Sequence, residues 1–433
     1  MTERVERNSN VLILLKSFPI LHKIKFVAIM RITEIRIEGL FDMFDHTIQL
    51  NQEEHLTVIY GINGIGKTMI FRILDCFYNG DFEELVELPF KKLNLTFSNG
   101  DALECSKMQF RTKTTLLFSM NEQIVYVPKR DEPLDFNLAK QKVFGTIDKL
   151  PIYFISTDRL RFLESIQYES GKISTLTTSN RLNYYSKKIA RDIRMINNEY
   201  LKLSEQLELS LSKRLIQKQI RRNITYDELI SIKEQVEKRI NQLQKIALIN
   251  NDMEVGFELS ETMDEIEQTL IAANLSDFQI KLTVFDDYYD KLMLFLDILN
   301  NRRLRYKTIS INNYSEIEYQ RTRYNKLTEF DGFQFINSKG RKLKSDQLST
   351  GEQHAIIMFY SLLFEVPENA LVLIDEPENS LHIVWQKAYL NDIKDIIALR
   401  GFDVIIATHS PSIINGEWDL TVSLKGIEEV AYV

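Results

Sequence analysis

The chain has 433 residues, of which 44% are hydrophobic and 27% charged, and its formal net charge is −7. This length allows two or three domains with large cores, and the composition is that of a folded protein without low-complexity tracts. Two cysteines, Cys76 and Cys105, are too few for a disulfide framework or a four-cysteine zinc site. No apolar run reaches the roughly 18 residues of a membrane span, so we expect a cytoplasmic protein without a membrane partner.

Residues 1–29 are expected to lie outside the fold. The apolar stretch Val11–Leu15 is soon interrupted by a lysine and a proline, and no small-residue cleavage site follows. Met30 stands directly before an alternating pattern at Arg31–Ile37, which is typical of a strand that starts a domain. We therefore interpret residues 1–29 as an extension from an upstream start site.

Residues 30–175 are expected to form the first half of a head domain. Apolar and alternating patterns, separated by turn residues, predict strands at Ile32–Ile37, His46–Leu50, Leu56–Tyr60, Leu93–Phe97, Leu103–Phe110, Thr114–Ser119, Ile124–Val127 and Ile152–Ile155. This pattern indicates half of an α/β fold with an antiparallel flank.

A glycine-rich loop, Gly61–Thr68, follows the apolar strand Leu56–Tyr60 and precedes a helix predicted from Met69. Glycines let backbone N–H groups wrap around phosphate oxygens at a helix N-terminus, where the helix dipole favours an anion. In this pattern the lysine neutralises the β- and γ-phosphates of ATP, and the threonine hydroxyl ligates Mg²⁺. The predicted binding residues are Gly61, Asn63, Gly64, Gly66, Lys67 and Thr68.

Residues 176–310 are expected to form a helical insertion. Two apolar seams with three- and four-residue spacing predict long helices, one through Ile189, Ile193, Ile196, Tyr200, Leu203 and Leu207 and the other through Leu229, Ile232, Val236, Ile240, Leu243 and Ala247. Thr225 and Glu228 form a capping-box pattern at the start of the second helix. We expect an antiparallel hairpin whose second helix, about 25 residues long, reaches roughly 37 Å. The segment from Phe257 to Lys307 also reads as helical.

The insertion is more basic than the rest of the chain. Between Arg181 and Asn250 fifteen Lys and Arg stand against eight Asp and Glu. Basic residues gather near the predicted tip, at Lys213, Arg214, Lys218, Arg221 and Arg222, and again where the chain returns to the head, at Arg302, Arg303, Arg305 and Lys307. The cluster at the tip suits the phosphates of nucleic acid, but a solvated coiled-coil face carries similar charges. Both interpretations stay open.

Residues 311–433 contain further strands that end in chemically useful side chains. One strand is predicted at Phe333–Ile336, and another, Leu371–Ile374, ends in two carboxylates. In this Walker B pattern Asp375 holds Mg²⁺ through water, and Glu376 orients or deprotonates the attacking water. A third strand ends at His409.

These motifs resemble those of ABC-type ATPases of the SMC, RecF and OLD group. Leu348–Gln353 is similar to the LSGGQ signature, with a threonine in place of one glycine, although read alone it is a good helix N-cap. The resemblance implies that Ser349, Gly351 and Glu352 act on the γ-phosphate held by an opposite subunit, so that a head-to-tail dimer completes each site. His409 is similar to the switch histidine that contacts the γ-phosphate.

The implied fold is α/β, an ABC-type P-loop ATPase head with a mixed sheet and an antiparallel β flank, interrupted by an α-helical hairpin or coiled-coil insertion. Ser349 lies 281 positions after Thr68, a separation far larger than a compact transporter domain needs.

ABC-type ATPases also carry a glutamine-bearing loop in the first half. Gln109 and Gln123 are candidates only by default, and Asp158 with Arg159 could replace that function.

The residues around Walker B and the switch histidine extend the resemblance to stand-alone prokaryotic members, among them the anti-phage ATPases PtuA of Septu and AriA of PARIS. Glu376–His382 is similar to the OLD-type continuation, with Ile383 where a proline is common, and Ile414–Leu420 is similar to the stand-alone members. We therefore expect a dimer or higher homo-oligomer that controls a separate effector, such as a nuclease. The alternative is a RecF- or SMC-like repair or recombination ATPase that contacts DNA directly through the basic insertion.

Two observations favour a separate effector. OLD nucleases carry a Toprim domain after the head, whereas 24 residues follow His409 in this sequence. The six histidines are not clustered as an HNH nuclease needs. If nucleic acid is cut, we expect another chain to cut it.

Overall fold

The structure is a computed structural model of the whole chain and describes residues 30–110, 113–127, 136–146, 151–156, 178–216, 224–312 and 332–424. The interpretation of residues 1–29 therefore concerns residues outside the described set. The same is true of Asp158 and Arg159, and of Lys218, Arg221 and Arg222 at the predicted hairpin tip.

A five-stranded parallel sheet, in the order β14-β3-β13-β12-β8, forms the centre of the head. Its strands are β3 (Leu56–Tyr60), β8 (Ile152–Ile155), β12 (Leu371–Asp375), β13 (Asp403–Thr408) and β14 (Thr421–Ser423). Every residue of β12 and β13 is buried, which explains their continuous apolar sequences. The strands that carry the predicted motifs therefore end at one common edge of the sheet.

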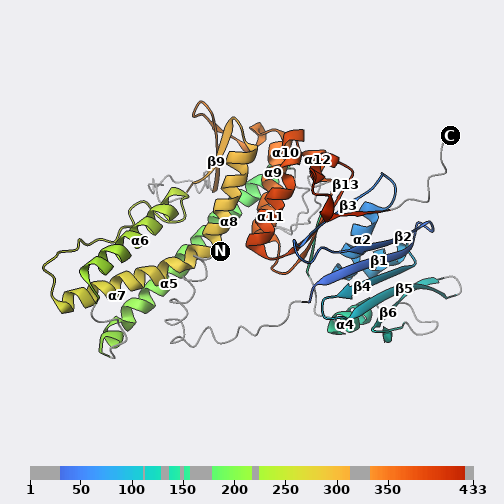
Figure 1. The fold of residues 1–433 in the computed structure, drawn as a ribbon, viewed down its shortest axis with the longest axis horizontal. Coiled ribbons are helices and arrows are strands. Elements are labelled where there is room, and N and C mark those ends of the chain that lie inside the picture. Colours follow the sequence, from blue (N-terminus) through green and yellow to red (C-terminus); the bar gives the residue numbers. More distant parts are fainter. Residues whose placement is uncertain are drawn as a thin grey trace, which may run out of the picture.

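A six-stranded antiparallel sheet, in the order β2-β1-β4-β5-β6-β7, flanks this centre (Figure 1). Its strands are β1 (Ile32–Leu40), β2 (Phe44–Gln49), β4 (Lys92–Phe97), β5 (Ala102–Phe110), β6 (Lys113–Met120) and β7 (Gln123–Tyr126). The helices α2 (Lys67–Asn79), α3 (Phe82–Glu87) and α4 (Phe136–Thr146) belong to the same part of the chain. Phe71 and Leu74 of α2 share one core with Ile35 of β1 and Ile405 of β13, so α2 joins the two sheets.

The helical insertion projects from the opposite end of the molecule (Figure 1). It comprises α5 (Thr178–Ile216), α6 (Tyr226–Lys245), α7 (Glu265–Leu282), the short η2 (Thr283–Phe285), α8 (Asp286–Asp297) and the π-helical η3 (Ile298–Arg303). Residues of both predicted apolar seams are buried, and the Thr225–Glu228 capping box is formed. The predicted insertion is therefore confirmed. No helix within the described ranges combines the length and apolar character needed to cross a membrane.

Some dimensions of the insertion differ from the prediction. α7 packs against both α5 and α6, so that three helices rather than two share the core of the arm. α6 has 20 residues and reaches about 30 Å, whereas the 39 residues of α5 span about 58 Å and continue into the head. The helix expected from Phe257 begins only at Glu265, where Asp264 and Glu267 form a second capping box.

The chain returns from the insertion through a small antiparallel sheet in the order β11-β10-β9. Its strands are β9 (Lys307–Asn312), β10 (Gly332–Asn337) and β11 (Lys342–Leu343). The remaining helices are η5 (Ser345–Gln347), α9 (Thr350–Tyr360), η6 (Ser361–Glu365), η7 (Pro377–Ser380), α10 (Ile383–Lys387), α11 (Tyr389–Arg400), α12 (Pro411–Ile414) and η8 (Trp418–Leu420).

Most of the basic residues where the insertion meets the head form ion pairs within the chain. Arg303 is fully buried against the fully buried Asp392 of α11, and Arg302 contacts Asp392 at 2.8 Å and Asp395 at 2.7 Å. Lys307 donates to Glu352 at 2.7 Å. These ion pairs tie the end of the insertion to the head, so the charges of these three residues are largely compensated within the chain.

Asp392→Ala is expected to lower the free energy of unfolding by about 3–5 kcal/mol, because it leaves the buried Arg303 guanidinium without its counter-charge. Urea unfolding followed by circular dichroism measures this loss. Asp395→Ala is the matched control, because among the described residues its half-exposed side chain forms an ion pair with Arg302 alone, which is more exposed than Arg303. A loss below about 1 kcal/mol is expected there. Equal losses in the two variants would contradict the assignment.

Candidate functional site

The predicted phosphate loop and Walker B residues meet at the carboxyl edge of the parallel sheet. β13 pairs with β3 on one side and with β12 on the other, placing Thr408 beside Tyr60 and Ala407 beside Asp375. Residues that directly follow these strands therefore emerge side by side. Ligands of parallel sheets characteristically bind at this edge.

The phosphate loop turns sharply into α2 at Gly66. Gly64 and Gly66 have φ angles of +89° and +97°, which residues with a side chain adopt only at a cost. A Cβ atom at Gly66 would also collide with Leu40, so only glycine fits there. The exposed residues Asn63 and Gly64 lie at the N-terminal end of α2, where backbone N–H groups favour an anion.

Lys67 and Thr68 connect the loop to the Walker B strand. The Lys67 ammonium donates to the carbonyl oxygens of Gly61 at 2.8 Å and Ile62 at 3.2 Å, and it lies 3.6 Å from Glu376 Oε1. Thr68 Oγ1 donates to Asp375 Oδ2 at 2.8 Å, although the two residues are 307 positions apart. The structure thus brings together the residues that the sequence assigned to phosphate and Mg²⁺.

Hydroxyl and carboxylate oxygens are the ligands that Mg²⁺ prefers, so Thr68 and Asp375 fit the predicted metal role. The ion is expected to add positive charge that neutralises phosphate oxygens. Glu376, Glu378 and His409 are the described residues whose His and carboxylate atoms lie close enough to form another possible metal set. Their direct contacts with one another indicate a hydrogen-bonded cluster.

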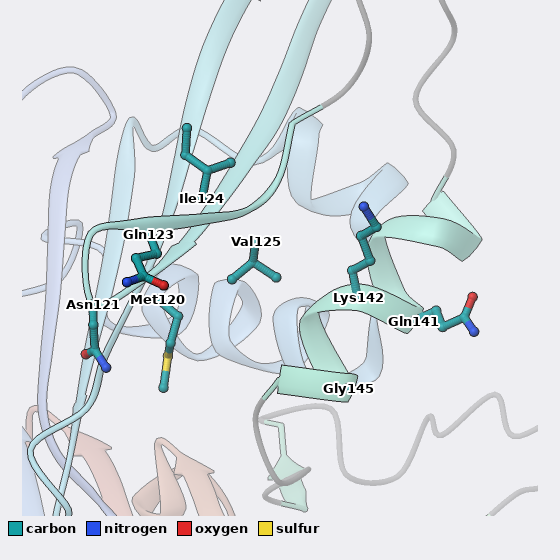
Figure 2. Close-up of a pocket in the computed structure, with 8 residues that line it drawn as sticks. All are labelled: Met120, Asn121, Gln123, Ile124, Val125, Gln141, Lys142 and Gly145. Carbon is teal, nitrogen blue, oxygen red and sulfur yellow. The ribbon is translucent and has the colours of Figure 1, made fainter.

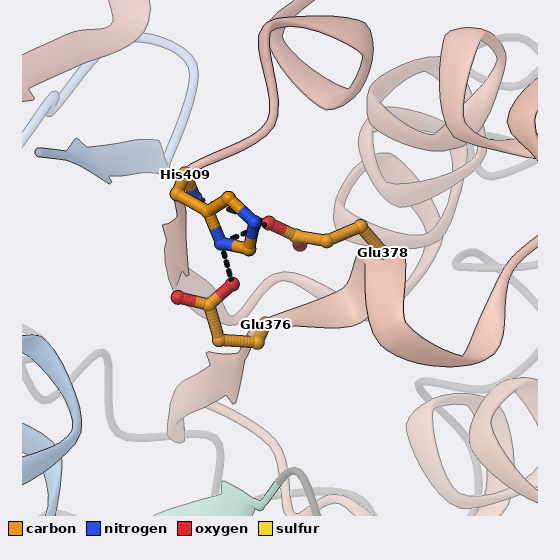
Figure 3. Close-up of side chains that lie close together, drawn as sticks. All are labelled: Glu376, Glu378 and His409. Atoms are coloured by element: carbon orange, nitrogen blue, oxygen red, sulfur yellow. Dashed lines mark hydrogen bonds and ion pairs between the residues drawn. The ribbon is translucent and has the colours of Figure 1, made fainter. Parts of the chain in front are cut away.

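Figure 3 shows this cluster at the ends of β12 and β13. Glu376 has a φ angle of +45°, a left-handed conformation that turns the chain away from the strand directly after Asp375. Its backbone N–H donates to the carbonyl of Ala407, and its Oε2 lies 2.5 Å from Nδ1 of His409. The site therefore aligns a carboxylate and an imidazole that directly follow two neighbouring strands.

Sequence reasoning assigned no role to Glu378, which the structure places in the cluster. This buried carboxylate accepts hydrogen bonds from Thr408 Oγ1 at 2.5 Å and from the backbone N–H of His409 at 3.0 Å. The same oxygen lies 3.2 Å from His409 Nδ1. The signal available in the sequence was a second carboxylate two positions after Glu376. Its partners could be identified only once β12 and β13 were known to be neighbours.

The environment of Glu376 suits a general base. Burial, followed by the nearby carboxyl group of Glu378, raises the pKa of Glu376 to about 7, while His409 partly opposes the shift. A carboxylate whose pKa lies near neutral pH accepts a proton more readily than an ordinary one. Glu376 can therefore orient water and take its proton.

The predicted signature lies apart from this site. Ser349 is the N-cap of α9 and forms a capping box with Glu352, whose carboxylate accepts from the Ser349 N–H at 2.7 Å and from Lys307. Among the described residues, no hydrogen bond or ion pair joins Ser349, Gly351 or Glu352 to Lys67 or Thr68. α9 packs in the core that contains the insertion, whereas α2 packs in the core of the six-stranded sheet.

The default candidates for the glutamine-bearing loop are not brought to the site. Gln109 lies in β5 and Gln123 in β7, both on the antiparallel sheet. Gln123 lines a surface pocket between the β6–β7 turn and α4 (Figure 2). Any role of Asp158 or Arg159 falls outside the described residues.

The sequence model of the AAA ATPase domain matches residues 30–414. The chain belongs to the AAA ATPase domain family. This match spans both halves of the head and the insertion, and it identifies the chain as an ATPase that binds nucleotide. The phosphate-loop and Walker B residues described above thus lie within the residues that match this family.

This AAA ATPase domain protein is also similar to a phage protein and to a solved head domain. A segment of 70 residues is 41% identical to protein ea59 of Escherichia phage lambda, but it covers only 16% of this chain and 13% of that protein. The crystal structure of the Smc head domain with an extended coiled coil, bound to the C-terminal domain of ScpA from Pyrococcus furiosus, aligns over 92% of this chain and 94% of that chain. The alignment has 12% identity and a TM-score of 0.41.

The pH dependence of ATP hydrolysis tests the role of Glu376. kcat/KM is expected to fall about tenfold per pH unit below pH 7, because protonated Glu376 cannot accept a proton and kcat/KM reports the free enzyme. Glu378→Gln removes a neighbouring negative charge that raises the Glu376 pKa, so the acidic limb is expected to move to lower pH. Glu417→Gln, at a half-buried carboxylate that pairs with Lys394 outside the cluster, is the control. If the acidic limb of the kcat/KM profile stays at the same pH in Glu378→Gln, the proposed effect of Glu378 on the pKa of Glu376 would be contradicted.

Proposed function

We propose that this chain binds ATP with Mg²⁺, hydrolyses it slowly, and closes as a head-to-tail dimer. The observation that carries the proposal is the convergence of Lys67, Thr68, Asp375, Glu376 and His409 from three neighbouring strand ends. A positive charge, a metal-ligand pair and a proton acceptor are the groups that phosphoryl transfer to water requires.

Each side chain has a separate task in this proposal. Lys67 neutralises the terminal phosphates, and the loop N–H groups around Gly64 and Gly66 bind their oxygens. Thr68 and Asp375 hold Mg²⁺. Glu376 orients and deprotonates the attacking water.

His409 is the proposed γ-phosphate contact, and the structure offers a reason for its position. Its side chain is 45% exposed, so a phosphate can reach the ring, while Nδ1 faces Glu376 and Glu378. Glu378 fixes the backbone at the end of β13 through Thr408 and the His409 N–H. The ring therefore stays oriented without being buried.

The separate location of the signature supports closure between two chains. Ser349 is the N-cap of α9 and Gly351 lies in its first turn, where backbone N–H groups and the helix dipole favour a phosphate. Glu352 keeps that turn ordered through the capping box and Lys307. Because the signature of one chain is not joined to its own phosphate loop, we propose that it acts on ATP held by a second copy.

The proposed output of closure is control of a separate effector, such as a nuclease, in prokaryotic anti-phage defence. This part rests on the resemblance of the head motifs to stand-alone defence ATPases. The RecF-like alternative, direct action on DNA, receives less support from the charges. Arg214 makes a two-bond ion pair with the buried Asp277 of α7, and Arg302 and Arg303 are paired with α11.

Two variants test the reaction. Glu376→Gln is expected to reduce ATP turnover by at least about 100-fold while still allowing ATP-dependent closure, because only the proton acceptor is lost. Lys67→Ala is expected to abolish both, because the phosphates lose their main counter-charge. Turnover of radiolabelled ATP and sedimentation with and without ATP measure the two properties. Wild-type turnover in either variant would refute the site assignment.

The Glu376→Gln variant also serves as bait for the effector. Tagged protein is recovered from its native host with ATP present and its partners are identified by mass spectrometry, with Lys67→Ala as the matched control. One stoichiometric protein retained only by Glu376→Gln is expected. DNA recovered without a stoichiometric protein would instead favour the repair alternative.

A further inference from the structure

The solvent-facing side of α5 carries an apolar stripe. Leu201, Leu209 and Ile216 are 61%, 78% and 81% exposed, although large aliphatic side chains are usually absent from the centre of a helix's polar face. Their spacings of eight and seven residues place them on one face. The buried seam of the same helix, which includes Ile193 and Leu207, lies on the opposite face. The stripe is therefore not an extension of the core.

Two charged residues within the stripe are placed symmetrically about Leu209. Glu205 precedes Leu209 by four residues, Lys213 follows it by four, and both are exposed. Among the described residues, neither makes a hydrogen bond or an ion pair. By contrast, their neighbours Glu208 and Arg214 are paired with α7. Within four residues on either side of Leu209, the described charged residues without such a contact are thus one acid and one base, at matching distances from the central leucine. A further exposed cation without such a contact, Lys202, precedes Leu209 by seven residues.

This pattern of charges lets two copies of α5 attract each other only when the two helices run antiparallel. If two copies of α5 cross antiparallel with Leu209 on the two-fold axis, Glu205 of each copy faces Lys213 of the other. In the same pairing, Leu201 of one copy lies one residue along the helix from the position directly opposite Ile216 of the other copy. A parallel pairing would instead bring Glu205 against Glu205 and Lys213 against Lys213, which like-charge repulsion disfavours. Two-fold contacts of this kind are the commonest form of self-association.

We propose that α5 is a self-association surface on which a second copy of this chain pairs antiparallel about Leu209. The contact uses one helix from each copy, which gives less than the roughly 1,600 Å² of a standard interface, so it is weak and depends on concentration. It includes no residue of the ATP site, so it forms without nucleotide.

Such a contact would have a consequence for the proposed head closure. Two chains already joined through their arms hold their heads at a raised effective concentration, which favours a second, ATP-dependent contact. This consequence rests on the proposed function, but the α5 pairing itself does not. The two can therefore fail independently.

Sedimentation velocity of the full chain without nucleotide, over a range of concentrations, tests the pairing. The wild type is expected to show a monomer–dimer equilibrium. Glu205→Lys is expected to weaken dimerisation by at least about tenfold in Kd, since it replaces two attractive contacts with repulsive ones. The double variant Glu205→Lys with Lys213→Glu reverses both charges and is expected to restore the wild-type Kd to within about threefold.

Leu209→Glu is expected to leave only monomers, because it places two like charges at the axis. Ile124→Glu, at a 65% exposed position of β7 on the antiparallel sheet, is the matched control and is expected to leave Kd unchanged. Circular dichroism confirms that each variant is folded. A nucleotide-free chain that stays monomeric, or a charge reversal that the double variant does not rescue, would overturn the proposal.

Discussion

The position of β13 between β3 and β12 is the constraint on which the candidate site depends. Parallel pairing on both sides sets the three strand ends at one level, so that the phosphate loop, Glu376 and His409 emerge together. The hydrogen bond from Thr68 to Asp375 then joins residues 307 positions apart. Glu378 fixes the other side of the site, because its carboxylate binds the last residue of β13 and the backbone of His409. A displacement of β13 would move His409 away from Glu376, and it would also separate these two residues from the phosphate loop that follows β3.

The same arrangement explains how a long insertion can interrupt an ATPase head. α5 leaves the head and β9 returns to it, and ion pairs secure both connections. Lys188 of α5 binds Glu365 at one end of the α9–η6 helical segment, and Lys307 of β9 binds Glu352 at the other. Arg302 and Arg303 tie the end of the insertion to α11. The arm is thus attached to the half of the head that carries the signature, while the phosphate loop belongs to the other core.

The sequence predicted the parts of this structure that follow from local patterns. The bounds of β3 and β8 were predicted to the residue, and the Thr225 capping box and the Lys67 loop were recognised from their residue types. What the sequence could not show arises from distant contacts. Arg302 and Arg303 were recognised only as part of a basic cluster, because Asp392, the carboxylate that they share, lies about 90 positions away. β9 was missed because the predicted helical segment extended to Lys307, the first residue of that strand. The role of Glu378 was missed because it exists only once β12 and β13 are adjacent.

The central claim is that ATP is hydrolysed at a site shared between two chains, and mixing two inactive variants tests it most directly. Lys67→Ala removes the phosphate loop's cation, and Ser349→Arg blocks the signature. In a head-to-tail dimer of one variant with the other, both defects fall in one site and the second site is intact. The account predicts that each variant alone is inactive and that the mixture recovers up to half of the wild-type turnover for each mixed dimer, which has one intact site of two. A mixture as inactive as its components, with mixed dimers shown to form, would contradict a shared site.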